Sequence, residues 1–425
     1  MSMLKLFISH SSKTNASKQL LCNLCNALQA NDNGCYVLVD KSGDIYPSDD
    51  WEQRLDEWLA ECHAAVILVS EAALESWWVQ KEATILKWRW RLDPNFKHLL
   101  IVLLDDLQED VFQQDRFKIL NLPQIQFLTG HNDDSAQIVA AIEKQLEKIE
   151  PADTAFDEMR EAISDSLSDV KPKTMKRVCQ KLQVDKRLGE TPKWSGSDNT
   201  PQAAALARLI LRKNESSLQT FNDVLNAIKP PIPADSAHWL YKTVFPLWVR
   251  EEAAVLLPLS LIDEAGSSRR IAINGKKLFP FTAESFVRRA YPLDDDWVLI
   301  PIDSTKTQAD AIAEEVRSYF REHITGDFNA SESDTDKEIR TFPSPIYILL
   351  AENVTDEYIL DELQAFYPNA EFLLSVGAEM PADTAIPAKA NPITPPLDIH
   401  LEERQNTQMK RARNLLNKLP GGLHR

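Results

Sequence analysis

One stretch of this chain, residues 76–82, places an indole and a carboxylate one helical turn apart. If the stretch is helical, Trp78 and Glu82 share one face, because they are spaced i and i+4. An indole can stack on a planar ring, and a carboxylate can stabilise positive charge that develops on a sugar. The pair therefore suits glycoside chemistry on a nucleotide. Taken alone, however, a helical glutamate is most often a solvated surface residue.

The segments before this pair predict a parallel α/β sheet. Residues 64–70 form a short, continuous and partly β-branched apolar run, which is typical of a strand buried on both faces. Residues 4–8 and 35–40 predict two earlier strands, and connections of helical length separate all three. This β-α-β-α-β order predicts a doubly wound parallel sheet, because such crossovers are right-handed.

Polar residues follow the first two predicted strands. The first strand ends with Phe7, Ser9, His10 and Ser11. The second ends at Asp40, before a polar loop over residues 41–50 and a helix that opens at Trp51. Open α/β sheets bind ligands at the carboxyl edge, where these residues are expected to lie. His10 has a second interpretation, as the cap of the helix that follows.

Four blocks resemble the TIR domains (Toll/interleukin-1 receptor-like), specifically the prokaryotic ones that cleave NAD+. The blocks are residues 7–12, 49–51, 66–70 and 76–82, and their order and spacing fit the family. The resemblance covers residues 1 to about 150 and implies a flavodoxin-like sheet there. Two features depart from it. Val79 stands where many relatives have Cys or another small residue, and the loop over residues 44–50 is acidic and contains proline, which could alter the nucleotide that is accepted.

The resemblance implies cleavage of the bond between nicotinamide and ribose, with NAD+ as substrate and no cofactor. Breaking this bond builds positive charge on the ribose, as in other reactions with an oxocarbenium-like transition state. Glu82 would then be the catalytic carboxylate that holds the ribose hydroxyls and stabilises that charge. Because nicotinamide departs from a cationic pyridinium as a neutral molecule, no general acid is strictly required.

The resemblance also implies which residues contact the substrate. Those expected to bind it are Phe7, Ser9, His10, Ser11, Asp40, Trp51 and Trp78. Trp78 would stack on the nicotinamide or adenine ring, and simple packing is the alternative. In relatives the loop after the second strand helps to complete the site from a neighbouring subunit, which implies self-association. Lys41, Asp44 and Asp50 flank this loop, where most residues are solvated.

Composition limits the class of protein. The length of 425 residues predicts two to four domains, and 44% of the residues are hydrophobic. No apolar run approaches the roughly 20 residues of a membrane span, and the first strand reaches polar Ser9 too soon for a signal peptide. The five cysteines are few and odd in number, which indicates a reducing compartment. We therefore expect a cytoplasmic protein.

The sequence also disfavours nucleic-acid binding, phosphate binding by a glycine-rich loop, and metal binding by the cysteines. A net charge of −17 disfavours nucleic-acid binding, and the basic segment over residues 410–425 predicts a short helix with a solvated, frayed end. Eleven glycines form neither a dinucleotide-binding fingerprint nor a P-loop. Cys22 and Cys25, spaced i and i+3, are expected on the apolar side of a helix, and without a second Cys or His pair they predict no metal site.

The rest of the chain predicts two further domains. Residues 151–232 are almost purely helical in pattern and predict a small bundle, with a faint likeness to the death-like, effector-associated modules of bacterial defence proteins. A proline-rich break ends this part. Residues 233–425 contain strand candidates at 297–302, 346–350 and 370–376, which predict a second α/β domain.

The last of these domains has a weak resemblance of its own. Its closing β-α-β segment resembles the Walker B to sensor portion of STAND ATPases, but no P-loop precedes it. We therefore expect an inactive, ATPase-like or other ligand-sensing domain. Residues 326–341 are acidic and predict a mobile loop.

The function that fits these observations is an NAD+-degrading or NAD+-cyclising effector of a bacterial anti-phage defence system. An unknown trigger would act through residues 151–425 and activate it by oligomerisation. Two alternatives stay open: a non-enzymatic TIR adaptor or scaffold, and a base-exchange or nucleoside-processing enzyme. Glu82 favours the effector, since an adaptor does not need this residue.

Overall fold

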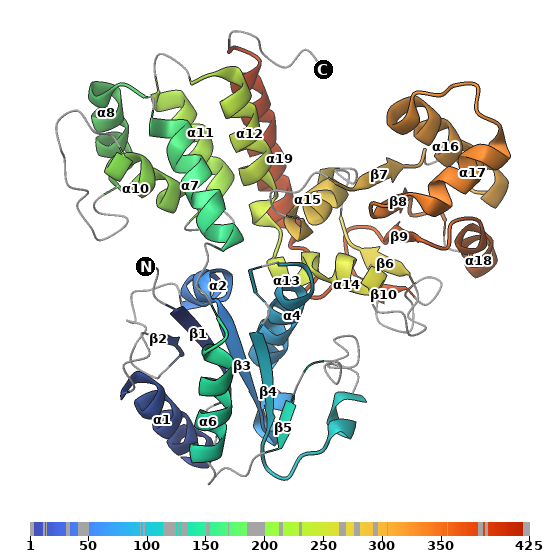
Figure 1. The fold of residues 1–425 in the computed structure, drawn as a ribbon. Helices are drawn as coiled ribbons and strands as arrows, with labels where there is room; N and C mark the ends of the chain where they lie inside the picture. Colours follow the sequence, from blue (N-terminus) through green and yellow to red (C-terminus); the bar gives the residue numbers. More distant parts are fainter. Residues whose placement is uncertain are drawn as a thin grey trace. The chain divides into compact units, whose positions relative to one another are not determined.

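The computed structural model divides the chain into two compact units, residues Met1–Ala162 and Ile163–Arg425 (Figure 1). It describes residues 4–11, 13, 15–30, 35–40, 51–93, 95–96, 98–113, 125, 127–129, 135–149, 154–168, 170–184, 200–211, 216–228, 232–262, 269–275, 281–291, 296–303, 305–354, 356–380, 386 and 390–419. The division of the chain into three domains at residues 150 and 232 stays a prediction.

The first unit is built on a five-stranded parallel sheet in the order β2-β1-β3-β4-β5. Its strands are β1 (Leu4–Ser9), β2 (Cys35–Leu38), β3 (Ala64–Val69), β4 (His98–Leu103) and β5 (Phe127–Thr129). This strand order is that of the flavodoxin-like doubly wound folds, whose switch point lies between β1 and β3. The fold class expected for this part is therefore confirmed.

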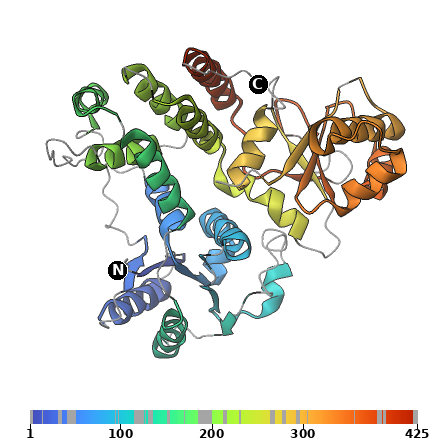
Figure 2. The ribbon, with the colours of Figure 1, turned by 45° about the horizontal axis from the view of Figure 1, so that its top comes forward.

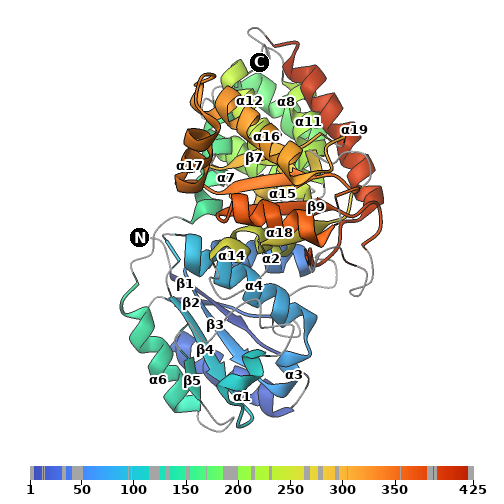
Figure 3. The same ribbon diagram turned by 90° about the vertical axis from the view of Figure 1, so that its right-hand side faces the viewer.

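Helices cover both faces of this sheet. One face packs against α1 (Asn15–Ala30) and α6 (Ser135–Leu146), and the other lies towards α2 (Trp51–Glu61) and α4 (Trp77–Leu92). Figure 3 shows α6 and α4 on the two sides of the strands. The side chains of Leu4, Leu6 and Ile8 belong to the α1 and α6 core. Because side chains alternate along a strand, Phe7 and Ser9 point to the α2 and α4 side.

Serines start the two helices that follow β3. Ser70 caps the short helix α3 (Glu71–Leu74), and its Oγ accepts a hydrogen bond of 3.2 Å from the backbone N–H of Ala73. Ser76 caps α4 and accepts one of 3.4 Å from Val79. Such caps satisfy backbone donors that lack partners in the first helical turn. Ser76 thereby fixes where the turn that carries Trp78 begins.

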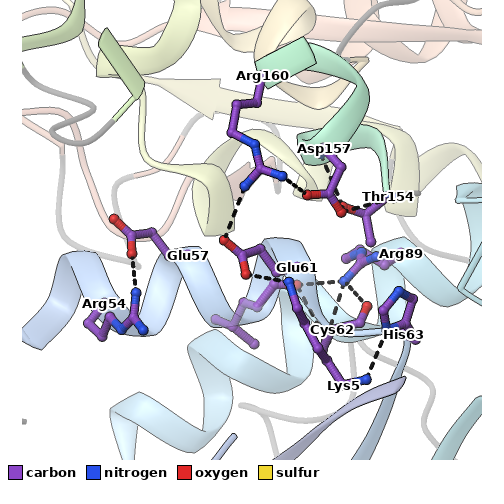
Figure 4. Close-up of polar contacts among 11 residues, drawn as sticks. Lys5, Arg54, Glu57, Glu61, Cys62, His63, Arg89, Thr154, Asp157 and Arg160 are labelled. Carbon is purple, nitrogen blue, oxygen red and sulfur yellow. Dashed lines mark hydrogen bonds and ion pairs between the residues drawn. The ribbon is translucent and has the colours of Figure 1, made fainter. Parts of the chain in front are cut away.

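A buried arginine holds the far end of this face together. Arg89 of α4 donates from Nη1 to the carbonyl oxygens of Leu59, at 2.7 Å, and Cys62, at 2.8 Å, where α2 ends. Its Nε and Nη2 donate to Asp93 Oδ2 at 3.1 and 2.8 Å. Figure 4 shows the Arg89 head group beside Cys62. The contacts satisfy carbonyl groups that a helix end leaves without partners.

The same edge of the sheet holds the start of helix α7 (Ala155–Ser168). Lys5 Nζ lies 2.6 Å from Glu61 Oε2, and Arg160 lies 4.0 Å from Glu61 and 2.6 Å from Asp157. In Figure 4 Arg160 reaches between these two carboxylates. Thr154 caps α7, since its Oγ1 accepts a 3.2 Å hydrogen bond from the backbone N–H of Asp157.

The two cysteines of α1 differ from the expectation. Cys25 is fully buried in the α1 and α6 core, whereas Cys22 is exposed, so only one thiol faces the apolar side. All five cysteines of the chain lie within the described residues, and none of them forms a disulfide. No described helix is both long and apolar enough to span a membrane.

The second unit begins with helices, as the sequence predicts. They are α7, which continues from the first unit, α8 (Pro172–Leu182), α10 (Thr200–Leu211), α11 (Ser217–Ala227) and α12 (Ala234–Val244). The C-terminal helix α19 (Ile399–Leu416) packs against α11 and α12. Asn222 of α11 donates to the backbone oxygen and to Oε1 of Gln408, both at 3.0 Å.

Residues 410–416 of the basic segment are helical as expected, but they close the longer helix α19, which has a packed face, and do not form a short helix of their own. Helix α19 has 18 residues and buries Leu401, Met409, Ala412 and Leu416. The cations of α19 lie between these apolar positions, so the cluster of charges did not indicate that one face of the helix is packed. Residues 420–425 lie outside the described part of the chain.

The second unit also contains a parallel sheet (Figure 2). Its strand order is β10-β6-β9-β8-β7. Its strands are β6 (Arg270–Ile273), β7 (Val298–Pro301), β8 (Ile346–Leu350), β9 (Ala370–Ser375) and β10 (Asn391–Pro392). Helices α16 (Ala309–Phe320), α17 (Glu332–Thr341) and α18 (Glu357–Phe366) pack on one face. On the other face are α13 (Glu251–Ala254), α14 (Leu256–Ile262) and α15 (Phe281–Ala290). This second α/β layer is as predicted.

The mobile loop expected at residues 326–341 is wrong for its second half, which forms α17. Ser331 caps this helix by accepting a 3.2 Å hydrogen bond from the backbone N–H of Asp334. Arg317 of α16 lies 2.9 Å from Asp336 and 3.5 Å from Glu332. The acidic run is ordered because a cap and a cation from the neighbouring helix compensate its charge.

Candidate functional site

Glu82 lies on α4 at the carboxyl edge of the first sheet and is 7% exposed. The surface interpretation of this residue is therefore wrong. Every residue from 81 to 89 of α4 is buried, so this part of the helix lacks the solvated face of an ordinary surface helix. A carboxylate in such a place loses most of its hydration, and its ionisation then depends on the groups around it.

Ser9 is the first of these groups. It ends β1, is fully buried, and stands opposite Ile67 of β3. Its hydroxyl lies close enough to Glu82 to lower the pKa of that carboxyl. The two groups nevertheless stop short of hydrogen-bond geometry, and neither Ser9 Oγ nor Glu82 Oε2 has a partner among the described residues. Both buried polar atoms can therefore still form a hydrogen bond, to water or to a ligand.

Burial raises the pKa of Glu82 to about 8. The nearby Asp40 carboxylate raises this pKa further, whereas Ser9 and the Lys81 ammonium lower it. At neutral pH most Glu82 side chains would then carry a proton. A cationic ring brought beside Glu82 would favour the ionised form, since an opposite charge stabilises a carboxylate.

Lys81 is held between two helices. Its Nζ lies 2.8 Å from Asp56 and 3.4 Å from Glu52, both on α2, and its side chain is 2% exposed. The ammonium also lies 5.5 Å from the centroid of the Trp78 ring. Trp78 in turn contacts Trp77, with ring centroids 4.7 Å apart, and Trp77 is 40% exposed.

His10 and Asp40 stand at the rim of the site. Asp40 is exposed and half-buried His10 follows Ser9 directly. Burial lowers the pKa of His10, while the Ile8 backbone and Asp40 act in the opposite direction. Since Asp40 also affects Glu82, this one carboxylate links both titratable groups.

The structure brings some of the expected residues together and not others. Ser9 and Asp40 act on the ionisation of Glu82, and Trp78 joins this group through Lys81. Phe7, only 1% exposed, is a residue of the sheet core. Ser11 is buried at the end of β1. The loop at residues 41–50 and the side chain of Trp51 lie outside the described part, and the substrate contacts of all these residues stay predictions.

Lys81 is the residue that sequence reasoning missed. Glu52 and Asp56 are spaced i and i+4 on α2, and Lys81 is adjacent to Glu82, but only the packing of α2 against α4 shows that the two acids bind this lysine. In the described residues no group of three or more His, Cys, Asp and Glu side chains is arranged to hold a metal ion.

These features define the class of the first unit: a flavodoxin-like α/β domain with a buried carboxylate at the carboxyl edge of its sheet. Residues 6–143 match the family of the TIR domain. This part of the chain is therefore a TIR domain, as the four sequence blocks indicated. No curated protein matches the chain.

Proposed function

We propose that this protein is an NAD+ nucleosidase that cleaves the bond between nicotinamide and ribose. The observation that carries the proposal is Glu82, a buried carboxylate beside Ser9 and Asp40 at the ligand-binding edge of a TIR domain. The bond from ribose C1′ to the pyridinium nitrogen breaks, and its electron pair stays on nicotinamide. Water then bonds to C1′ and releases a proton to give ADP-ribose, or the adenine ring attacks to give a cyclic isomer.

The surroundings of Glu82 suit this chemistry. The transition state has an oxocarbenium-like charge, and an ionised carboxylate stabilises it more strongly in a water-poor site than in bulk solvent. The positive nicotinamide ring would itself help to ionise Glu82, whose pKa is about 8 without it. Substrate binding and activation of the carboxylate are then coupled, and a neutral ligand would not produce the same effect.

The residue test uses Glu82→Gln in the full chain, with nicotinamide release followed by chromatography. Loss of at least a thousandfold in turnover is expected, on the order of the 4 kcal/mol that one preorganised electrostatic contact supplies. Glu75→Gln is the matched control, because Glu75 lies at the end of α3 and is exposed. Full turnover by a folded Glu82→Gln variant would remove this residue from the mechanism.

We further propose that the protein is the effector of a bacterial anti-phage system and works in the cytoplasm. An uncontrolled NAD+ consumer would kill its host, so most of the chain is expected to be regulatory. A trigger that acts through residues 151–425 would favour self-association of the TIR domains. A protein that assembles on triggering but never releases nicotinamide would instead be a non-enzymatic adaptor, the other role that a TIR domain allows.

A further inference from the structure

Lys81 is buried, so other charged or polar groups must replace the water that its ammonium group loses. Moving an ammonium group out of water costs several kcal/mol unless charged or polar partners replace its hydration. The partners here come from one face of α2, where Asp56 lies at 2.8 Å and Glu52 at 3.4 Å from Nζ. Two acids for one cation fix the place of the ammonium and leave it little freedom to turn towards solvent.

The position of this ammonium matters because Lys81 lies between Trp78 and Glu82 in the sequence of α4. It lies 5.5 Å from the Trp78 ring centroid, within the range of a cation–π interaction. It also lowers the pKa of Glu82, the next residue along the helix. Lys81 is thus linked to the indole and to the carboxylate, the pair that suits nucleotide chemistry.

We propose that Lys81 is a positioning residue for the NAD+ cleavage proposed above: its ammonium group, held by Asp56 and Glu52 of α2, orients Trp78 and supplies a fixed positive charge next to Glu82. The kinetic part of this inference rests on the proposed function. The electrostatic part does not, because it concerns the ionisation of Glu82 in the protein without substrate.

Other groups around Glu82 also affect its pKa. Ser9 of β1 lies beside the carboxyl, Asp40 at the end of β2 adds a negative charge, and half-buried His10 lies near Asp40. From α2, Asp56 and Glu52 are the acids that bind Lys81. Among the described groups that affect the pKa of Glu82, Lys81 supplies the positive charge. Removing it leaves burial and Asp40 acting together to keep Glu82 protonated.

The test compares Lys81→Met with Lys81→Arg in the full chain. Methionine keeps an unbranched side chain without the charge, so kcat/KM should fall severalfold at neutral pH and recover at alkaline pH. The profile shifts to higher pH because fewer Glu82 side chains are ionised at any given pH. Arginine keeps the charge and should leave the profile close to that of the wild-type protein.

Lys5→Met is the matched control. Lys5 forms an ion pair of 2.6 Å with Glu61 of the same helix α2 (Figure 4). Lys5 lies at the start of β1 and Ser9 at its end, so this pair is at the opposite edge of the sheet from Glu82. The Lys5→Met substitution removes a similar contact to α2 without altering the charge near Glu82. If Lys5→Met moves the pH profile as far as Lys81→Met, Lys81 acts only by anchoring α2, and the inference is overturned.

A second readout needs no turnover. The ionisation of Glu82 is followed by infrared spectroscopy, as the difference in the carboxylic acid band between each protein and its Glu82→Gln version. We expect Lys81→Met to move this titration to higher pH. Asp56→Asn keeps Lys81 charged but less tightly held, and should move the titration to lower pH. An unchanged titration in folded Lys81→Met overturns the inference. If Lys81→Met does not fold, the titration of Asp56→Asn is the deciding measurement.

The two readouts separate the inference from the proposed function. If the wild-type protein never releases nicotinamide, the proposed NAD+ cleavage fails, and the infrared titration still tests whether Lys81 controls Glu82. If nicotinamide is released and the titration does not respond to Lys81, the proposed function stands and the role of Lys81 is wrong.

Discussion

At the scale of single residues, the chemistry of this domain depends on the ionisation of one carboxyl. The ordinary pKa of a glutamate is 4.5, and in the folded protein that of Glu82 is about 8. A carboxyl whose pKa is higher in the folded than in the unfolded state stabilises the fold only in its protonated form. The folded state therefore loses stability as pH rises from about 4.5 through about 8.

The first prediction follows from this loss of stability with rising pH. Glu82→Gln, which resembles the protonated acid at every pH, should unfold at a higher temperature than the wild-type protein at alkaline pH and at a similar temperature under acid conditions. The shift corresponds to on the order of 5 kcal/mol at most. Scanning calorimetry at a series of pH values measures it. Exposed Glu75→Gln should show no such trend, and a constant difference for Glu82→Gln would contradict the raised pKa.

Sequence reasoning could reach Ser9 and Asp40, because each ends a predicted strand, and Glu82, because it ends the block over residues 76–82. It could not reach the burial of Glu82. The rule that charged helical residues are solvated holds for most helices, and in α4 it fails because residues 81–89 are all buried. The same rule hid Lys81, since its partners come from another helix and appear only once α2 and α4 pack together.

At the scale of elements, strands were predictable where they are long and apolar. β3 and β8 could be recognised as continuous apolar runs. β6 has four residues and begins with Arg270, and β10 is the dipeptide Asn391–Pro392. Segments this short have no periodicity of their own, and only pairing with β9 and with each other defines them.

The second prediction concerns the junction of α2 and α4. Arg89→Ala should destabilise the first unit by about 3 to 5 kcal/mol, because the partner carboxylate and two carbonyl groups would stay buried without their donor. Arg54→Ala is the control. Arg54 forms a 2.8 Å pair with Glu57 on α2 but is exposed, so its loss should cost less than about 1 kcal/mol. Urea unfolding compares the two, and equal costs would contradict the structural role of Arg89.

At the scale of the whole molecule, the end of the chain packs beside its middle within the second unit. Helix α19 returns to α11, to which Asn222 and Gln408 bind it, although the two residues are 186 positions apart. No local pattern in the sequence could reveal such a pairing. It also means that the helices of this unit are not made by one continuous stretch of chain.

The third prediction tests this pairing. Deleting residues 399–425 removes α19 and the apolar contacts of Leu401, Met409 and Leu416, and should expose the faces of α11 and α12. Each of these large side chains contributes roughly 1.5 to 3 kcal/mol when buried. We expect faster proteolysis of residues 200–244 in the truncated protein. Deleting only residues 420–425 is the control and should change nothing. Equal resistance in both would show that α19 is dispensable.

The last prediction concerns assembly of the complete protein. If the NAD+ site is completed by association of TIR domains, specific activity should rise faster than linearly with protein concentration, and a trigger should raise oligomer size and nicotinamide release together. A ligand shifts such an equilibrium only through its higher affinity for the assembled state. Light scattering and nicotinamide release, recorded on the same samples, measure both. Glu82→Gln is the control that should assemble without turnover. Should activity appear with no change in oligomer size, opening of the site within a single chain would replace association as the mechanism.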